Sequence, residues 1–230
     1  AQLTEQAAEQ TAAQSKEQRQ SQNQNNSQNN SHERRAYSPT TLAELDELTR
    51  LYPQARLLAG GTDLALEVTQ QHKHLDTLIY LGQVADLKQI SHHPHHIEIG
   101  AACSLTDAQP SLSAEYPDMG PLLERFASQQ IRNQGTLGGN IANASPIGDM
   151  PPALIAAGAS LLLRHEGNSR SLPLSEFFID YRKTHLLPGE YIEKIIIPRK
   201  PDQSIYRLYK VSKRIDDDIS AVLAAINITL

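Results

Sequence analysis

The sequence is poor in the residues that several classes of protein require. It holds one cysteine, Cys103, among 230 residues, so an internal disulfide or a cysteine-ligated cluster within the chain is excluded. The formal net charge of −5 gives no basic stripe of the kind that nucleic-acid binding needs. No apolar run approaches the roughly 20 residues of a membrane span, and no signal peptide opens the sequence. These deficits predict a cytoplasmic protein without nucleic-acid or membrane partners.

Two nucleotide-binding fingerprints are also missing: neither G-x-G-x-x-G nor a Walker A motif occurs. The chain has instead two glycine turns, at residues 59–63 and 135–149. The second turn, predicted to be a loop, combines four glycines with the short polar residues Asn140, Asn143, Ser145 and Asp149. A glycine-rich turn that leads into a helix presents unpaired N–H groups to anions, phosphates above all. Two such turns suit a large ligand with a central diphosphate.

The pattern of apolar residues predicts an α+β protein in several parts. Its ends suggest a fragment of a longer polypeptide, because the first residue is Ala and the last stretch is apolar. The predicted parts are a disordered polar linker at 1–35, a small α/β unit at 36–86, a larger β-rich unit at 87–203, and strands at 204–230. The folded part of the sequence is expected to begin near Tyr37.

Helices and strands follow from the same pattern. Helices are predicted at 41–51, 64–71 (capped by Asp63), 106–113, 119–127, 153–157 (with prolines at its start) and 175–178. Strands are predicted at 55–59, 77–81, 87–91, 97–101, 159–164, 170–172, 190–197, 204–211 and 219–229. The first glycine turn then follows the carboxyl end of a strand, where ligands of open α/β sheets bind.

Four further features have alternative interpretations. The histidines at 92, 93, 95 and 96 suggest a metal site, but Pro94 interrupts them and should turn them to different sides, so we predict no metal here. Cys103 should be a small buried residue, not a nucleophile. Asp216, Asp217 and Asp218 could be a site or a solvated turn paired with nearby basic residues. The basic loop at 181–184 could contact phosphate or only water.

Four motifs together resemble one family. They are LLAGGTDL (57–64), IRNQGTLGGNIANASPIGD (131–149), YRKT (181–184) and SKRIDDDIS (212–220). In this order they resemble the FAD-binding domain of molybdenum hydroxylases, in particular the small subunit of bacterial xanthine dehydrogenase. The resemblance extends from about residue 37 to 230. It implies the two-subdomain FAD-binding fold of the vanillyl-alcohol oxidase type, followed by the start of a C-terminal flavoprotein domain. That last segment, 205–230, should pack incompletely or leave a sheet edge open.

The resemblance also implies a set of FAD contacts. Asp217 matches an acidic position near the flavin and the nicotinamide, and no side chain is expected to act as a catalytic acid or base. The matching cofactor positions are Leu57, Leu58, Ala59, Gly60, Gly61, Thr62, Asp63, Leu64, Phe126, Thr136, Gly138, Gly139, Asn140, Asn143, Gly148, Asp149, Ile192 and Lys210.

The function implied is electron transfer in purine catabolism. FAD would accept electrons from iron–sulfur clusters and reduce NAD+ by hydride transfer, with the protein supplying position and electrostatics. The clusters would lie in an N-terminal domain of the same polypeptide, and molybdopterin in a partner large subunit. The alternatives are a sibling hydroxylase of the carbon monoxide dehydrogenase, aldehyde oxidase or hydroxybenzoyl-CoA reductase type, or a docking fragment that has lost its flavin.

Overall fold

The computed structural model describes residues 34–229 of the chain. The disordered linker predicted over residues 1–35 lies outside this part except at its last two positions. At Arg35 the prediction is wrong, because this residue already begins a β-strand that pairs with residues 77–79. Its backbone N–H donates to the Asp76 carbonyl at 2.8 Å. The folded part of the chain therefore includes residues before Tyr37.

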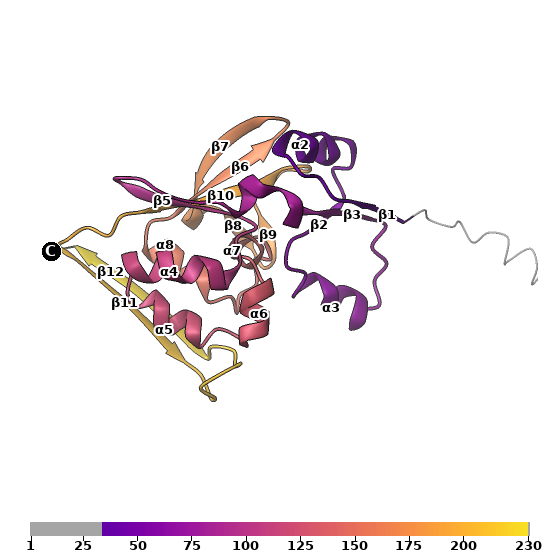
Figure 1. Cartoon of the computed structure of the whole chain (residues 1–230). Helices are drawn as coiled ribbons and strands as arrows, with labels where there is room; N and C mark the ends of the chain where they lie inside the picture. The colour runs from indigo at the N-terminus through magenta and orange to yellow at the C-terminus, as the bar shows by residue number, and fades with distance from the viewer. Residues whose placement is uncertain (1–33, 230) are drawn as a thin grey trace, which may run out of the picture. The chain divides into compact units, whose positions relative to one another are not determined.

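A small parallel sheet with two helices occupies residues 35–80 (Figure 1). Its elements are β1 Arg35–Tyr37, α2 Leu42–Leu51, β2 Arg56–Leu58, α3 Leu64–Thr69 and β3 Thr77–Tyr80. The strand order is β1-β3-β2, and both pairings are parallel. A helix lies in each connection between consecutive strands, as parallel pairing requires. The glycine turn at 59–63 follows the carboxyl end of β2, as predicted.

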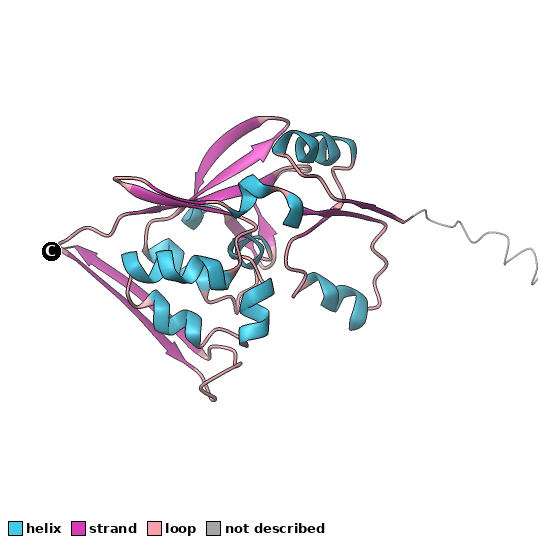
Figure 2. Cartoon of the chain, viewed as in Figure 1, coloured by secondary structure: helices cyan, strands magenta, loops and turns pink. Residues whose placement is uncertain are grey.

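The larger part of the chain is built on a five-stranded antiparallel sheet (Figure 2). Across the sheet the strands are β4 Ile90–His92, β5 His96–Gly100, β10 Tyr191–Pro198, β6 Ser160–His165 and β7 Asn168–Pro173. The register of β10 against β6 shifts between Ile192 and Lys194. Such a bulge reverses the alternation of side chains along a strand. Ile192, Ile195 and Ile197 therefore all reach the same core.

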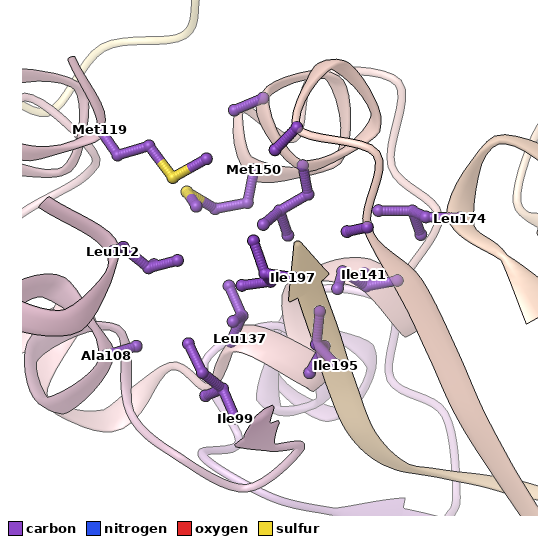
Figure 3. Close-up of a cluster of buried hydrophobic side chains, with 14 of the residues drawn as sticks. Ile99, Ala108, Leu112, Met119, Leu137, Ile141, Met150, Leu174, Ile195 and Ile197 are labelled. Atoms are coloured by element: carbon purple, nitrogen blue, oxygen red, sulfur yellow. The ribbon is translucent and has the colours of Figure 1, made fainter. Parts of the chain in front are cut away.

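Short helices lie on one side of this sheet and enclose the main core (Figures 1 and 3). They are α4 Leu105–Glu115, α5 Met119–Glu124, α6 Gln129–Gln134, α7 Leu137–Ala142 and α8 Met150–Ala156. The side chains of Leu112, Met119 and Met150 point from three helices toward the sheet, where they meet Ile99 and Ile197. All five are buried, so hydrophobic burial holds the helices in place. Among the described residues, no helix is long and apolar enough to cross a membrane.

The last described strands form a separate hairpin of β11 Ser204–Val211 and β12 Val222–Thr229. Tyr206 packs into the main core, and its hydroxyl donates to the Ala153 carbonyl at 2.7 Å. On β11, Ile205 and Tyr209 alternate with Tyr206 and are 45% and 54% exposed. The hairpin is thus covered on one face only, in line with the incomplete packing expected there. A smaller hairpin joins β8 Phe178–Asp180 to β9 Lys183–Thr184.

The long glycine segment is not the loop that the sequence predicts, because residues 137–142 form helix α7. The Thr136 side chain caps this helix by accepting from the Gly139 N–H at 3.0 Å. Leu137 and Ile141, one turn apart, are both buried. Capping and burial therefore outweigh the low helix propensity of the two glycines inside it. Helix α6, just before it, is also absent from the prediction.

Several other boundaries differ from the prediction. The helix predicted at 175–178 is instead a 3-10 turn at 174–176, followed by β8 from Phe178. A strand is predicted at 87–91. The structure instead has the 3-10 turn η2 at Ala85–Lys88, and the strand that follows, β4, covers Ile90–His92. The helix predicted over 119–127 ends at Glu124, and Ala127 has a φ of 45° that no α-helix accommodates. Further 3-10 turns are η1 Leu81–Gln83 and η3 Leu174–Glu176.

A buried polar cluster joins α2 to the larger sheet. Asp46 accepts from Arg164 Nη2 at 2.8 Å, from Arg164 Nε at 3.1 Å and from the Tyr191 hydroxyl at 2.8 Å. Arg164 Nη1 lies 3.4 Å from Glu193 Oε2. Burial, together with the bond to Asp46, raises the pKa of Tyr191, so the phenol remains protonated and donates. One carboxylate thereby connects the helix to strands β6 and β10.

Removing the Asp46 carboxylate should destabilise the whole domain. Asp46→Ala leaves the Arg164 guanidinium and the Tyr191 hydroxyl without their acceptor, which should lower the free energy of unfolding by about 3 kcal/mol. Urea denaturation followed by far-UV circular dichroism measures the change. Glu47→Ala is the matched control, since Glu47 is exposed on the same helix, and should change stability by less than about 0.5 kcal/mol. Equal stability of the two variants would contradict the role given to Asp46.

Candidate functional site

Three segments that are distant in sequence line one cavity of about 460 Å³. They are β2 with the turn after it, the stretch from the end of α5 to the start of α8, and the hairpin β11–β12 with its connecting loop. Most of the residues predicted to contact a cofactor line this cavity. They are Leu57, Ala59, Gly60, Gly61, Thr62, Asp63, Leu64, Phe126, Thr136, Gly139, Asn140, Asn143, Gly148, Asp149 and Lys210, and Asp217 lines it too.

Leu58, Gly138 and Ile192 do not line the cavity. A Cβ on Gly138 would lie 2.5 Å from the Ala101 Cβ, so this glycine lets α7 pack closely against the end of β5. Ile192 is 5% exposed and belongs to the main core. The Leu58 side chain packs beneath Gly61, whose added Cβ would lie 3.1 Å from it. The structure therefore gives these three residues packing roles.

The two glycine turns press directly against each other. A Cβ on Gly60 would lie 1.7 Å from the carbonyl oxygen of Gln134 and 3.0 Å from the Gly135 Cα. Only glycine fits at such a distance. Gly61 has a φ of 71°, a left-handed conformation that glycine adopts without strain. The turns predicted as two separate cradles thus form adjoining walls of one cavity.

The backbone donors of this site belong mainly to the first turn. At the start of α7, the Leu137 and Gly138 N–H groups donate to the Cys103 and Ala101 carbonyls, both at 3.0 Å. The Gly139 N–H is also paired, so α7 does not supply the unpaired donors expected of a helix start. Helix α8 has two prolines in its first turn, and proline has no N–H to donate.

Within the described residues, nothing accepts from the N–H groups of Gly61, Thr62 and Asp63. The expected cap is not formed either, because the Asp63 side chain makes no capping hydrogen bond to α3. Consecutive unpaired N–H groups in a turn can bind an anionic oxygen. The first turn therefore has the backbone donors that an anionic ligand of this cavity would need.

Asn140 supplies an unpaired acceptor in the cavity wall. Its Oδ1 is buried and has no hydrogen-bond partner among the described residues. A buried acceptor without a partner is costly, and a ligand that donates a hydrogen bond there removes the cost. Phe126, Ile147 and Ile219 contribute apolar surface to the cavity wall. The cavity thus offers donors, an acceptor and apolar walls, as a nucleotide cofactor requires.

Asp149 and Lys210 hold in place the third wall of the cavity, which is the β11–β12 hairpin with its connecting loop. Their side chains are 5% and 4% exposed, and Lys210 Nζ lies 2.5 Å from Asp149 Oδ2. The Ser220 hydroxyl donates to Asp149 Oδ1 at 2.6 Å. Strand β11 and the loop that leads into β12 are therefore both connected to the start of α8 through one buried carboxylate.

Arg125 holds the loop that connects β11 to β12, which contains Asp216, Asp217 and Asp218. Its guanidinium donates to the Lys210 carbonyl at 3.0 Å, to the Ser212 hydroxyl at 2.9 Å and to the Ile215 carbonyl at 3.3 Å. Within the loop, Arg214 N–H donates to Asp218 at 2.8 Å, and this bond lowers the pKa of Asp218. The neighbouring Asp217 reaches the cavity wall, so the loop is partly an internally paired turn and partly a site.

The remaining sequence candidates lie outside the cavity. Cys103 is buried as predicted, and burial raises its thiol pKa to about 11, so it is not a nucleophile at neutral pH. In the basic loop, Arg182 stacks over Tyr181 and Lys183 lies 3.6 Å from Asp180. The histidines bring two rings together, with His93 stacked on His96, contrary to the expectation that Pro94 separates them.

Comparison with known proteins identifies the domain. The family described as the FAD binding domain in molybdopterin dehydrogenase matches residues 30–200. The chain belongs to this family. It is 34% identical over 209 residues to xanthine dehydrogenase of Emericella nidulans, covering 86% of this chain. It is 33% identical over 216 residues to nicotinate hydroxylase hnxS of the same organism, also covering 86%.

The FAD-binding domain spans about 15% and 16% of those two relatives. Among solved structures, it is similar to carbon monoxide dehydrogenase from Hydrogenophaga pseudoflava, with a TM-score of 0.80 and 25% identity, over 85% of this chain and 69% of that chain. This similarity confirms the expected FAD-binding fold, and the family confirms FAD as the cofactor. The predicted boundaries between the two FAD-binding subdomains, at residue 86, and before the last segment, at residue 203, stay predictions.

The observed cavity fits FAD. The unpaired N–H groups of the first turn suit its diphosphate, and the orphaned Asn140 oxygen suits a donor group of the cofactor. Sequence analysis missed several residues that complete the site of the FAD-binding domain: Leu105, Arg125, Ala127, Ile147, Ile219 and Ser220. No local pattern singles them out, because packing and hydrogen bonds across distant segments bring them there.

Filling the space at Gly139 should abolish FAD binding. A Cβ there would lie 2.7 Å from Thr136 Oγ1, so Gly139→Val must either displace the capping hydroxyl or enter the cavity that both residues line. The ratio of flavin absorbance to protein after purification measures the effect, with an expected loss of at least about tenfold. Thr136→Ser keeps the capping hydroxyl and should retain FAD. Stoichiometric FAD in Gly139→Val would disprove this geometry.

Breaking the buried pair should loosen the third wall. Lys210→Met leaves the buried Asp149 side chain with only Ser220 as a partner, which should lower the free energy of unfolding by about 3 kcal/mol and reduce FAD content. The double variant Lys210→Met/Asp149→Asn removes the unpaired charge and should recover much of the stability. Lys213→Met, exposed on the same hairpin, is the control. Thermal unfolding of the three variants tests the pairing, and no rescue by the double variant would argue against it.

Proposed function

We propose that this FAD-binding domain is the electron-transfer part of a xanthine dehydrogenase. The observation that carries the proposal is the cavity, with its unpaired donors in the first turn, in a chain 34% identical to a xanthine dehydrogenase. When bound, FAD would supply the redox chemistry of this domain, between iron–sulfur clusters as electron donors and NAD+ as hydride acceptor. The protein supplies position and electrostatics, so no side chain is needed as acid or base.

The chain's own residues divide the work of binding. The N–H groups of Gly61, Thr62 and Asp63 would hold phosphate oxygens, and Asn140 Oδ1 would accept a hydrogen bond. The Lys210–Asp149 pair would keep the β11–β12 hairpin in position against the start of α8. Asp217, at the cavity wall with a φ of 49°, would lie near the position of the electron acceptor. Leu58, Gly138 and Ile192 would support the site from behind its walls.

The proposed setting extends beyond this chain. An N-terminal domain of the same polypeptide would carry the iron–sulfur clusters, and a large subunit would carry molybdopterin. NAD+ would be the acceptor, in the purine catabolism of a cytoplasmic enzyme of bacterial type. The unpaired buried thiol of Cys103 is in keeping with a reducing compartment.

A second candidate is a hydroxylase of another heterocycle. The 33% identity to a nicotinate hydroxylase nearly equals that to xanthine dehydrogenase. Because the substrate would react at the molybdenum centre on another subunit, the cavity of this chain would be the same in both enzymes.

The complete enzyme that contains this chain separates these candidates. With xanthine as reductant we expect NADH formation at 340 nm, and with nicotinate none. Introducing Gly139→Val should abolish NAD+ reduction, because electrons would no longer reach the acceptor through FAD. Reduction of the iron–sulfur clusters by xanthine, followed in their visible absorbance, should persist. Turnover of nicotinate alone would support the second candidate, and undiminished NAD+ reduction by the variant would exclude the electron-transfer role.

A further inference from the structure

The tip of the β4–β5 hairpin gathers three metal-ligating side chains outside the cavity. The ligand atoms of His93, His96 and Glu98 all lie within 4.8 Å of one another. His96 Nε2 is 3.3 Å from Glu98 Oε1, and His93 Nε2 is 3.8 Å from Glu98 Oε2. The two imidazole rings stack with centroids 4.6 Å apart and planes inclined by 22°.

The hairpin backbone fixes this arrangement. The His93 N–H donates to the His96 carbonyl at 2.9 Å, which closes the turn around Pro94. Arg199 Nε donates to the His93 carbonyl at 3.1 Å, and the Arg199 N–H donates to the His95 carbonyl at 2.9 Å. The turn is therefore held at both ends, and the two rings are presented on the same side.

One nitrogen of this group has no partner. His93 Nε2 is buried and makes no hydrogen bond within the described residues, although the ring itself is partly exposed. At 3.8 Å, Glu98 is too far to accept a hydrogen bond from it. A buried nitrogen without a partner destabilises the protein, and a bound cation would remove that penalty.

We propose that His93, His96 and Glu98 form a binding site for a divalent transition-metal ion of the Zn²⁺ class. Two imidazole nitrogens and one carboxylate oxygen suit such ions, whereas Mg²⁺ and Ca²⁺ prefer oxygen ligands only. In tetrahedral zinc sites, ligand atoms lie about 3.3 Å apart, as follows from metal–ligand distances of about 2.0–2.1 Å. The observed separations need only small side-chain rotations to reach that value. Water would occupy the fourth position, because the group is partly exposed.

Lys194 decides how Glu98 can bind the ion. Its ammonium lies 3.0 Å from Glu98 Oε2 and 3.7 Å from Glu193 Oε1. The lysine can remain on Oε2 while Oε1, which faces His96, binds the metal. A carboxylate oriented by a second partner is usual around metal ions. The positive charge of Lys194 nevertheless opposes the cation, so its removal should strengthen metal binding.

Isothermal titration of the FAD-loaded full chain with ZnCl₂ tests the site, using protein without a histidine tag. We expect one saturable equivalent, weakened by about tenfold or more in His93→Gln and in Glu98→Gln. His95→Gln is the matched control, since His95 is exposed on the same turn and outside the group, and should bind as the parent does. Lys194→Met should bind more tightly, which gives a readout that misfolding cannot imitate.

Titration with Co²⁺ adds a direct view of the ligands, because tetrahedral nitrogen and oxygen coordination gives strong visible bands. The absence of saturable binding would overturn the proposal. So would an equal loss in His95→Gln, which would indicate diffuse binding to the histidine tract, or unchanged binding in Glu98→Gln. The flavin absorbance of every variant should match the parent, since none of these residues lines the FAD cavity.

Discussion

The close approach of Gly60 to the Gln134 carbonyl is the constraint on which the site depends. A Cβ at Gly60 would come within 1.7 Å of that oxygen, so no other residue lets these two segments touch. This contact joins the turn of the small parallel sheet to the stretch that precedes α7. Once both are fixed, they form adjoining walls of the cavity, and residues 61–63, whose N–H groups have no acceptor among the described residues, line it.

The third wall depends on a different interaction. The β11–β12 hairpin packs on the main core through Tyr206, Leu208 and Leu223, and its other face is exposed. Its position at the cavity is set by polar groups. Asp149, at the start of α8, binds Lys210 and Ser220, and Arg125, at the end of α5, binds the loop between the two strands. A wall held by directional bonds can be placed accurately without a large core of its own.

Two buried carboxylates thus have the same structural task in this FAD-binding domain. Asp46 connects α2 to the five-stranded sheet, and Asp149 connects α8 to the last hairpin. Buried ion pairs add little net stability, since desolvation offsets most of their attraction, but losing one partner is strongly destabilising. Their main effect here is on geometry, because Asp46 accepts bonds from strands β6 and β10, and Asp149 accepts bonds from β11 and from the loop that follows it.

The sequence by itself determined the chemistry of this protein. Its alternation of helices and strands predicted the fold class, and its glycine turns predicted an anion-binding site, because φ requirements and short polar groups are local properties. The resemblance carried by the order of its motifs then implied FAD and most of the residues that line the cavity. Only the tertiary structure decided which donors remain free. The N–H groups of α7 are used by Cys103 and Ala101, Gly138 serves packing, Arg125 and Ser220 enter the site, and His93 meets His96 across Pro94. These outcomes depend on contacts between segments far apart in the chain, whose geometry no local pattern specifies.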